Sequence, residues 1–223
     1  SSALTIASPL VLQAQDVFDL KQQYVKHEYM IPMRDGVKLY TQVYSPKDQV
    51  QQFPILMTRT PYGVGNYGPE EFRPSLGPSP VFAKEGYIFA YQDVRGKFKS
   101  EGEFFHHPPY IANKKSTKDV DESSDCYDTI DWLLRNHANH NGRVGLWGIS
   151  AGGYTTAKGM IDAHPALKAA SPQASPGDQF IGDDYHHYGA FRLMYAFSWT
   201  SNNARIRSGP TEERPKQFDY GTP

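Results

Sequence analysis

The sequence has 223 residues, enough for one sizeable core, and its 39% hydrophobic and 21% charged residues are ordinary for a globular protein. Its 23 basic residues nearly balance 24 acidic ones, which argues against nucleic acid or an anionic membrane surface as a partner. A single cysteine, Cys126, excludes an internal disulfide and a cysteine-based metal cage.

Residues 1–15, SSALTIASPLVLQAQ, combine a short apolar run with small residues. This composition resembles the end of a secretory signal without its charged start, and it predicts a periplasmic or secreted protein. An ordinary disordered tail or an artificial remnant is the alternative. No stretch reaches the roughly 18 apolar residues that a membrane-spanning helix requires, so no membrane partner is expected.

The next segments predict strands of two kinds. Residues 24–31 and 37–45 alternate apolar and polar side chains around a short Pro- and Asp-Gly-containing turn, which predicts an antiparallel hairpin. Residues 53–60 and 87–93 are almost continuously apolar or aromatic, as in strands covered on both faces of a parallel sheet. The Gly- and Pro-rich residues 63–86 between them predict an elaborate loop, helical only near its end.

A helix is predicted over residues 119–137, which begin with acids and place apolar side chains at helical spacing. Residues 143–148 then predict a short strand, residues 151–164 a second helix, and residues 166–173 another strand. This alternation implies right-handed crossovers, and hence an α/β domain with a mostly parallel sheet behind an antiparallel hairpin.

The periodic pattern stops after about Arg192, where the sequence becomes polar and Pro-containing. We therefore assign residues 16–195 to one α/β domain. Residues 196–223 are expected to be a mobile insert or the start of a cap region that the chain does not finish.

Residues 148–152 read Gly-Ile-Ser-Ala-Gly where a buried strand meets a helix. A chain that turns so sharply needs small neighbours, and it projects the hydroxyl of Ser150 from the sheet as a nucleophile. The N–H of Ala151, at the start of the helix, is placed to stabilise the negative charge of a tetrahedral intermediate. The alternative is a Gly-rich turn with an incidental serine, as in nucleotide-binding folds.

Six stretches between about Tyr24 and Arg192 together resemble the peptidase S15 (CocE/NonD) group of α/β-hydrolases. They are TRTPYG (58–63), YQDVRGKFKSEGEF (91–104), DCYDTIDWLLR (125–135), NGRVGLWGISAGGY (141–154), HPALKAASPQASP (164–176) and GDDYHHYGAF (182–191). This group contains X-Pro dipeptidyl peptidases, cocaine esterase and the α-amino acid ester hydrolases, often labelled glutaryl-7-ACA acylases. The last stretch is most similar to the α-amino acid ester hydrolases.

The resemblance implies an α/β-hydrolase fold and an acyl-enzyme mechanism. Ser150 would be acylated, and the hydroxyl of Tyr62 would join the N–H of Ala151 in the oxyanion hole. Asp184 would bind the ammonium group of an α-amino acyl substrate. From the residues alone, Tyr62 could instead be an aromatic packed in a loop, and Asp183 and Asp184 a solvated pair or a loop brace.

Two departures from the family pattern stand out. Ala151 and Gly152 occupy positions where the family usually has Tyr followed by Glu or Leu, which leaves the preference for the acyl group open. More seriously, the general base is missing. His186 and His187 lie on one loop with the acids, and His164 would lie about 20 Å away along a helix rising ~1.5 Å per residue. We therefore expect the triad Asp and His beyond residue 223, so that the fold is incomplete in this chain.

The remaining polar groups are interpreted as structural. Asp93 and Arg95 are expected to brace a strand end. Two pairs of adjacent histidines, His106-His107 and His186-His187, could suggest a metal site. Adjacent side chains point in different directions, and no carboxylate or cysteine completes a ligand set at the required spacing, so no metal or other cofactor is expected.

The leading hypothesis is a serine hydrolase that cleaves small esters, amides or peptides, with homo-oligomerisation left open. The alternatives are an X-Pro dipeptidyl peptidase or a general esterase on the same fold, and a non-catalytic hydrolase fragment.

Overall fold

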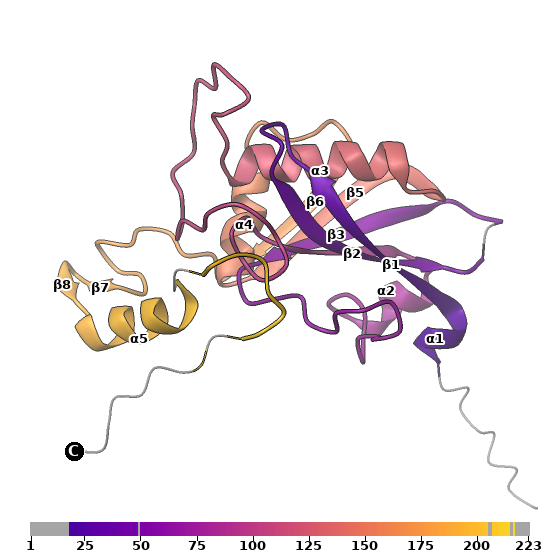
Figure 1. Ribbon diagram of the computed structural model, residues 1–223, viewed down its shortest axis with the longest axis horizontal. Helices are drawn as coiled ribbons and strands as arrows, with labels where there is room; N and C mark the ends of the chain where they lie inside the picture. Colours follow the sequence, from indigo (N-terminus) through magenta and orange to yellow (C-terminus); the bar gives the residue numbers. More distant parts are fainter. Residues whose placement is uncertain (1–17, 49, 205–206, 215, 217–223) are drawn as a thin grey trace, which may run out of the picture.

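A six-stranded mixed sheet organises the chain (Figure 1). The computed structural model describes residues 18–48, 50–204, 207–214 and 216, so the predicted signal remnant at residues 1–15 lies outside the described residues. In the sheet the strands follow the order β1-β2-β4-β3-β5-β6. They are β1 (Tyr24–Pro32), β2 (Lys38–Pro46), β3 (Phe53–Thr60), β4 (Ile88–Asp93), β5 (His140–Ile149) and β6 (Leu167–Gln173).

β2 alone runs opposite to the other five strands of the sheet. β1, β2 and β4 pair antiparallel, whereas β4, β3, β5 and β6 pair parallel. The mostly parallel sheet and the N-terminal hairpin are therefore confirmed. Parallel neighbours end at the same edge of the sheet, which brings the loops after β3, β4 and β5 together.

Apolar side chains are buried on both faces of the central strands. In β4, Ile88 and Ala90 face one core and Phe89 and Tyr91 face the other. Alternate residues of a strand point to opposite faces, so a strand buried on both sides has to be apolar throughout.

Helices cover both faces of the sheet (Figure 1). α3 (Glu122–Asn136) and α4 (Ala151–Gly159) pack together and against strands on one face, and α2 (Pro80–Lys84) contributes to the other core. A short α1 (Leu20–Gln23) precedes β1. None of the helices in the described part of the chain is long and apolar enough to cross a membrane.

α3 begins as its acidic start predicts. Asp121 accepts from the backbone N–H of Ser124, whose hydroxyl in turn accepts from the N–H of Asp121. This reciprocal capping satisfies two N–H groups that the first turn leaves without helical partners.

Two elements differ from the sequence-based prediction. α4 ends at Gly159 rather than at residue 164, because the chain packs tightly there against Cys126 and Leu146 and then turns through Asp162 at a φ of 49°. Past Arg192, where no regular structure was predicted, the chain forms α5 (Leu193–Asn203). α5 stands beside the small hairpin of β7 (His186–His187) and β8 (Ala190–Phe191), at one side of the main sheet (Figure 1).

Candidate active site

Ser150 occupies the turn between β5 and α4 with an unusual backbone conformation. Its φ is 58° and its ψ is −122°, a region that residues with a side chain seldom adopt and that marks stored strain at functional sites. The N–H of Ser150 donates to the carbonyl of Gln173 in β6 over 3.0 Å, and its side chain is exposed and caps nothing. The turn therefore presents the hydroxyl away from the sheet.

Two glycines allow this turn to close. A Cβ on Gly148 would lie 2.1 Å from the carbonyl oxygen of Gly152, and a Cβ on Gly153 would lie 2.3 Å from that of Gln173. Gly152, the second glycine of the sequence motif, has more room, since its Cβ would lie 3.6 Å from the oxygen of Arg59.

Ala151 is the first residue of α4 and is buried. The N–H of a first helical residue has no acceptor within its own helix. It therefore faces the region beyond the helix start, where an anion is favoured by the helix dipole as well.

Tyr62 follows β3, the strand beside β5. Met57 lies opposite Leu146 in this parallel pair, so the ends of β3 and β5 reach the same edge of the sheet. The hydroxyl of Thr155 in α4 also donates to the carbonyl of Arg59 over 3.0 Å, which fixes the helix start against the end of β3. The structure thus brings Tyr62, Ser150 and Ala151 to one edge of the sheet.

Asp93 braces the Tyr62 loop, in agreement with its structural interpretation. It is fully buried at the end of β4 and accepts from the N–H of Val64 over 2.8 Å, from the Tyr67 hydroxyl over 3.1 Å and from the N–H of Lys99 over 3.3 Å. Burial raises the pKa of Asp93 to about 6, although these donors oppose the shift. Arg95 pairs with Asp35 and Asp125, also a structural role.

The hydroxyl of Tyr62 has a partner that the sequence did not suggest. Trp199 of α5 donates its indole Nε1–H to the Tyr62 oxygen over 3.2 Å, with the two rings edge to face at 6.4 Å. Tyr62 is 37% exposed, so it is only partly packed by its neighbours.

His106 and His107 lie near the start of α4, where they line a small pocket together with Ala151 and Tyr154. Their ring centroids lie 3.8 Å apart, so the two side chains do not point in different directions as predicted. The ring of His106 also packs on Trp199 at 4.0 Å, and that of His107 packs on Tyr154 of α4 at 4.2 Å, both in tilted arrangements. Burial lowers the pKa of His106 to about 4 and also lowers the pKa of His107. Among the described residues, no group of three His, Cys, Asp or Glu side chains is arranged to hold a metal ion.

Asp183 and Asp184 have different surroundings. The Asp183 carboxylate accepts from the N–H groups of Gly177 and Asp184, so it braces its own loop. Asp184 instead hydrogen-bonds the hydroxyl of Tyr195, whose pKa rises through burial and then through the charge of Asp184.

The three histidines that follow Ser150 in sequence are engaged elsewhere. His164 lies 3.7 Å from Asp131 of α3, the ring of His186 lies 2.6 Å from the carbonyl of Gln179, and His187 is exposed. Within the described ranges, no histidine hydrogen-bonds to Ser150. The base that a serine nucleophile needs is therefore not supplied by these groups.

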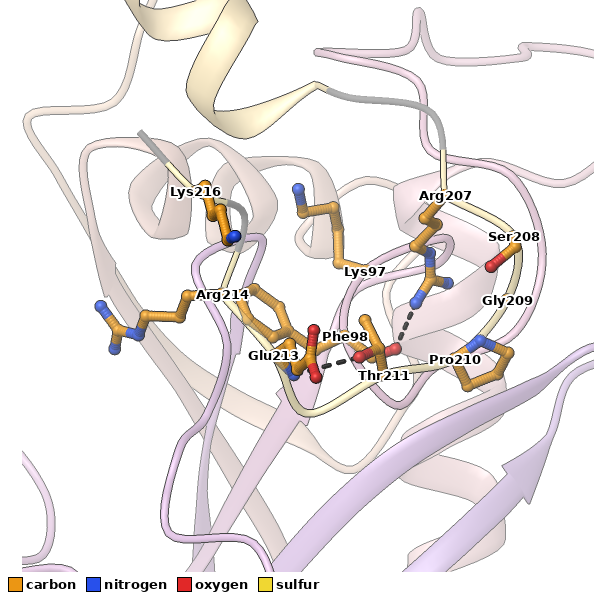
Figure 2. A pocket seen from close by; sticks show the side chains of 10 residues that line it. All are labelled: Lys97, Phe98, Arg207, Ser208, Gly209, Pro210, Thr211, Glu213, Arg214 and Lys216. Carbon is orange, nitrogen blue, oxygen red and sulfur yellow. Dashed lines mark hydrogen bonds between the residues drawn. The ribbon is translucent and has the colours of Figure 1, made fainter. Parts of the chain in front are cut away.

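A cavity of about 730 Å³ lies away from Ser150, between the loop after β4 and residues 207–214 (Figure 2). Its basic lining side chains are Lys97, Arg207, Arg214 and Lys216. Lys97 donates to the carbonyl of Asn203 at the end of α5, and Arg207 to that of Phe98. These two cations therefore anchor the segment that follows α5 to the loop after β4.

A parallel sheet whose strand runs into a helix through a strained, exposed serine defines an α/β-hydrolase. The chain belongs to the S15 peptidase family, since the family model described as X-Pro dipeptidyl-peptidase (S15 family) matches residues 35–221. This is a family of serine hydrolases that includes esterases and peptidases.

Three relatives illustrate the similarity. Cocaine esterase from Rhodococcus sp. (strain MB1 Bresler) is 31% identical over 79% of this chain and 28% of its own length. The solved aminopeptidase from the marine sediment archaeon Thaumarchaeota archaeon is 38% identical with a TM-score of 0.76, over 97% of this chain and 35% of that one. A solved α-amino acid ester hydrolase is 37% identical with a TM-score of 0.70, over 90% and 33%. The chain thus spans about a third of the length of these relatives.

Proposed function

We propose that the protein hydrolyses esters or amides through an acyl-enzyme on Ser150. The main support for this proposal is the position of Ser150, which lies at φ 58° on the turn between β5 and α4, at the sheet edge where Tyr62 also lies. The serine oxygen attacks the carbonyl carbon of the substrate, and its proton passes to a base outside the described residues. The resulting oxyanion accepts from the N–H of Ala151 and the hydroxyl of Tyr62.

The intermediate then collapses, expelling the alcohol or amine, which takes up a proton as it leaves. In the second half of the reaction, water gives a proton to the same base and attacks the ester carbonyl carbon of the acylated Ser150. The bond to the serine oxygen then breaks, the base returns the proton to Ser150, and the acid is released. Both tetrahedral intermediates carry charge on the same oxygen, so one pair of donors serves both steps.

Labelling with a fluorophosphonate tests this mechanism. In the protein at its full encoded length, we expect one adduct, mapped by peptide mass to Ser150 and absent from the Ser150→Ala variant. Ser171→Ala, which removes an exposed hydroxyl on β6, serves as the control and keeps the label. An unlabelled Ser150 in a folded protein would refute the proposal.

We further propose that the acyl group carries a free α-amine, bound by Asp184. Two relatives, an aminopeptidase and an α-amino acid ester hydrolase, are named for such substrates. The support in this chain is that the Asp184 carboxylate faces Tyr195 while its neighbour Asp183 braces the loop. A carboxylate next to a bound ammonium group strengthens binding by a charge-assisted hydrogen bond.

The test compares an α-amino ester with its des-amino analogue. Asp184→Asn is expected to lower kcat/KM for the amino ester by about tenfold or more, as for loss of a hydrogen bond to a charged group, and to leave the analogue unchanged. Asp162→Asn is a matched control, because Asp162 is exposed and lies at a positive φ that asparagine tolerates. Equal losses on both substrates would remove this role and favour a general esterase.

We also propose that the protein is exported, on the basis of the short apolar run with small residues at positions 1–15. Cell fractionation of the producing organism tests this. Recovery of the protein in the cytoplasmic fraction alone would contradict it.

A further inference from the structure

The indole of Trp199 and the hydroxyl of Tyr62 come from segments 137 residues apart and meet at 3.2 Å. An indole N–H can only donate, so the Tyr62 oxygen is the acceptor of this bond. The hydroxyl hydrogen of Tyr62 is therefore not consumed by Trp199, and it stays available for a second partner.

We propose that Trp199 is a positioning residue of the oxyanion hole, whose N–H holds the Tyr62 oxygen so that the phenolic hydrogen points at the substrate oxyanion. The inference rests on the proposed function of Tyr62. A donor fixed before the reaction stabilises the transition state without reorganising. A phenol that accepts one hydrogen bond also becomes a better donor in the next, because linked hydrogen bonds polarise one another.

Two contacts restrain the indole and its helix. The ring of His106 packs on the indole at 4.0 Å with the planes 41° apart, and the hydroxyl of Tyr185 lies 3.4 Å from the His106 ring nitrogens. The last turn of α5, which carries Trp199, is anchored where Lys97 donates to the carbonyl of Asn203. The Trp199 ring is therefore restrained by His106, by its hydrogen bond to Tyr62 and by the anchored end of its helix.

The contact also explains how Tyr62 keeps its place. Tyr62 is 37% exposed, and its backbone N–H donates to a near neighbour in sequence, the hydroxyl of Thr60, over 3.1 Å. A partly exposed phenol would otherwise sample several orientations. The Trp199 bond removes that freedom at the one atom that matters for the oxyanion.

A double-mutant cycle in the protein at its full encoded length tests the proposal, with kcat and KM measured on an α-amino ester. Tyr62→Phe is expected to lower kcat by about 100-fold, as for removal of one oxyanion donor. Trp199→Phe is expected to lower kcat by about three- to tenfold, the effect of one ordinary hydrogen bond, with KM little changed. In the Tyr62→Phe background the same Trp199→Phe change should alter kcat less than twofold.

Trp132→Phe is the matched control, because Trp132 packs against Tyr29 at 5.0 Å on α3 and should leave kcat as it is. If Trp199→Phe does not fold, 3-benzothienylalanine at position 199 keeps the bicyclic ring and removes only the N–H, and the same loss in kcat is expected.

A loss from Trp199→Phe that is equal in both backgrounds would overturn the proposal, since Trp199 would then act by packing and not through the hydroxyl. No loss in either background would overturn it as well. Failure of the proposed function is distinguished by the separate absence of a fluorophosphonate adduct on Ser150.

Discussion

Replacement of Gly153 by alanine tests how closely α4 must approach β6 for Ser150 to be presented. The added Cβ would lie 2.3 Å from the carbonyl oxygen of Gln173, and 3.2 and 3.3 Å from the carbonyl carbon and nitrogen of that residue. All three atoms belong to the backbone of β6, so no side chain can swing aside. The same carbonyl oxygen accepts from the N–H of Ser150, and the methyl group therefore displaces the acceptor of the nucleophile's own N–H.

The expected cost follows from these contacts. Overpacking a tight site costs about 1 to 3 kcal/mol, and the upper end applies because the neighbours are backbone. Loss of the Ser150 hydrogen bond adds about 1 kcal/mol, while alanine's better helix propensity returns about 1 kcal/mol. We expect Gly153→Ala to lower the free energy of unfolding by about 3 kcal/mol and to weaken labelling of Ser150.

Gly152→Ala is the matched control, one residue away in the same helix. Its Cβ would lie 3.6 Å from the Arg59 oxygen, an ordinary contact, so stability should stay level or rise by up to about 1 kcal/mol. Urea titration followed by circular dichroism measures both variants. If Gly153→Ala is as stable as the parent, or if both variants lose the same amount, the close-approach argument is wrong.

Two further predictions concern buried charge. Arg59 forms a buried ion pair with Glu122 at 2.6 Å and also lies 3.8 Å from the buried Asp125 carboxylate. Glu122→Gln removes the nearer partner and leaves Asp125, so it should cost up to about 3 kcal/mol in urea titrations. A double change of Arg59 and Glu122 to Met and Leu should recover part of that loss, and an unaffected single variant would contradict the prediction. Burial lowers the pKa of His137 to about 4 from 6.5, so the unfolded chain binds the proton first. Stability is then complete above about pH 6.5 and falls between pH 6.5 and 4, by on the order of 2 kcal/mol, and His137→Gln should flatten that slope. An unchanged slope would count against the shift.

The sheet could be predicted from the sequence because its central strands are buried on both sides. The predicted range 53–60 coincides with β3, and 87–93 differs from β4 by one residue. A strand buried on both faces is apolar throughout, so its sequence is not mistaken for that of a polar loop. The serine turn was predictable for a related reason, since Gly148 and Ser150 fall where an apolar run ends.

α5 could not be predicted because its apolar residues do not form one face. Leu193, Met194, Tyr195 and Phe197 are all exposed in the described part of the chain, so the segment lacks the stripe by which a helix is found in a sequence. Trp199 was missed with it. The sequence does contain an aromatic-rich run before residue 200, but composition alone does not predict whether such a run is a helix, a strand or a loop.

The sequence motif also directed attention to the wrong second glycine. It pairs Gly148 with Gly152, whereas the structure places the tight contacts at Gly148 and Gly153. The contact partner of Gly153 is Gln173, on a strand 20 positions later. A local sequence pattern shows that small residues cluster, but it does not show which distant strand packs against them.

The nucleophile and the phenolic donor of this site are positioned by different parts of the fold. Ser150 depends on the approach of α4 to β6, through Gly153. The Tyr62 loop depends on Asp93, which holds Val64 directly and also holds Lys99 in the loop to which the end of α5 is anchored. A change at Asp93 should therefore displace both Tyr62 and its Trp199 partner while Ser150 keeps its geometry, so the oxyanion hole can be lost without loss of the nucleophile.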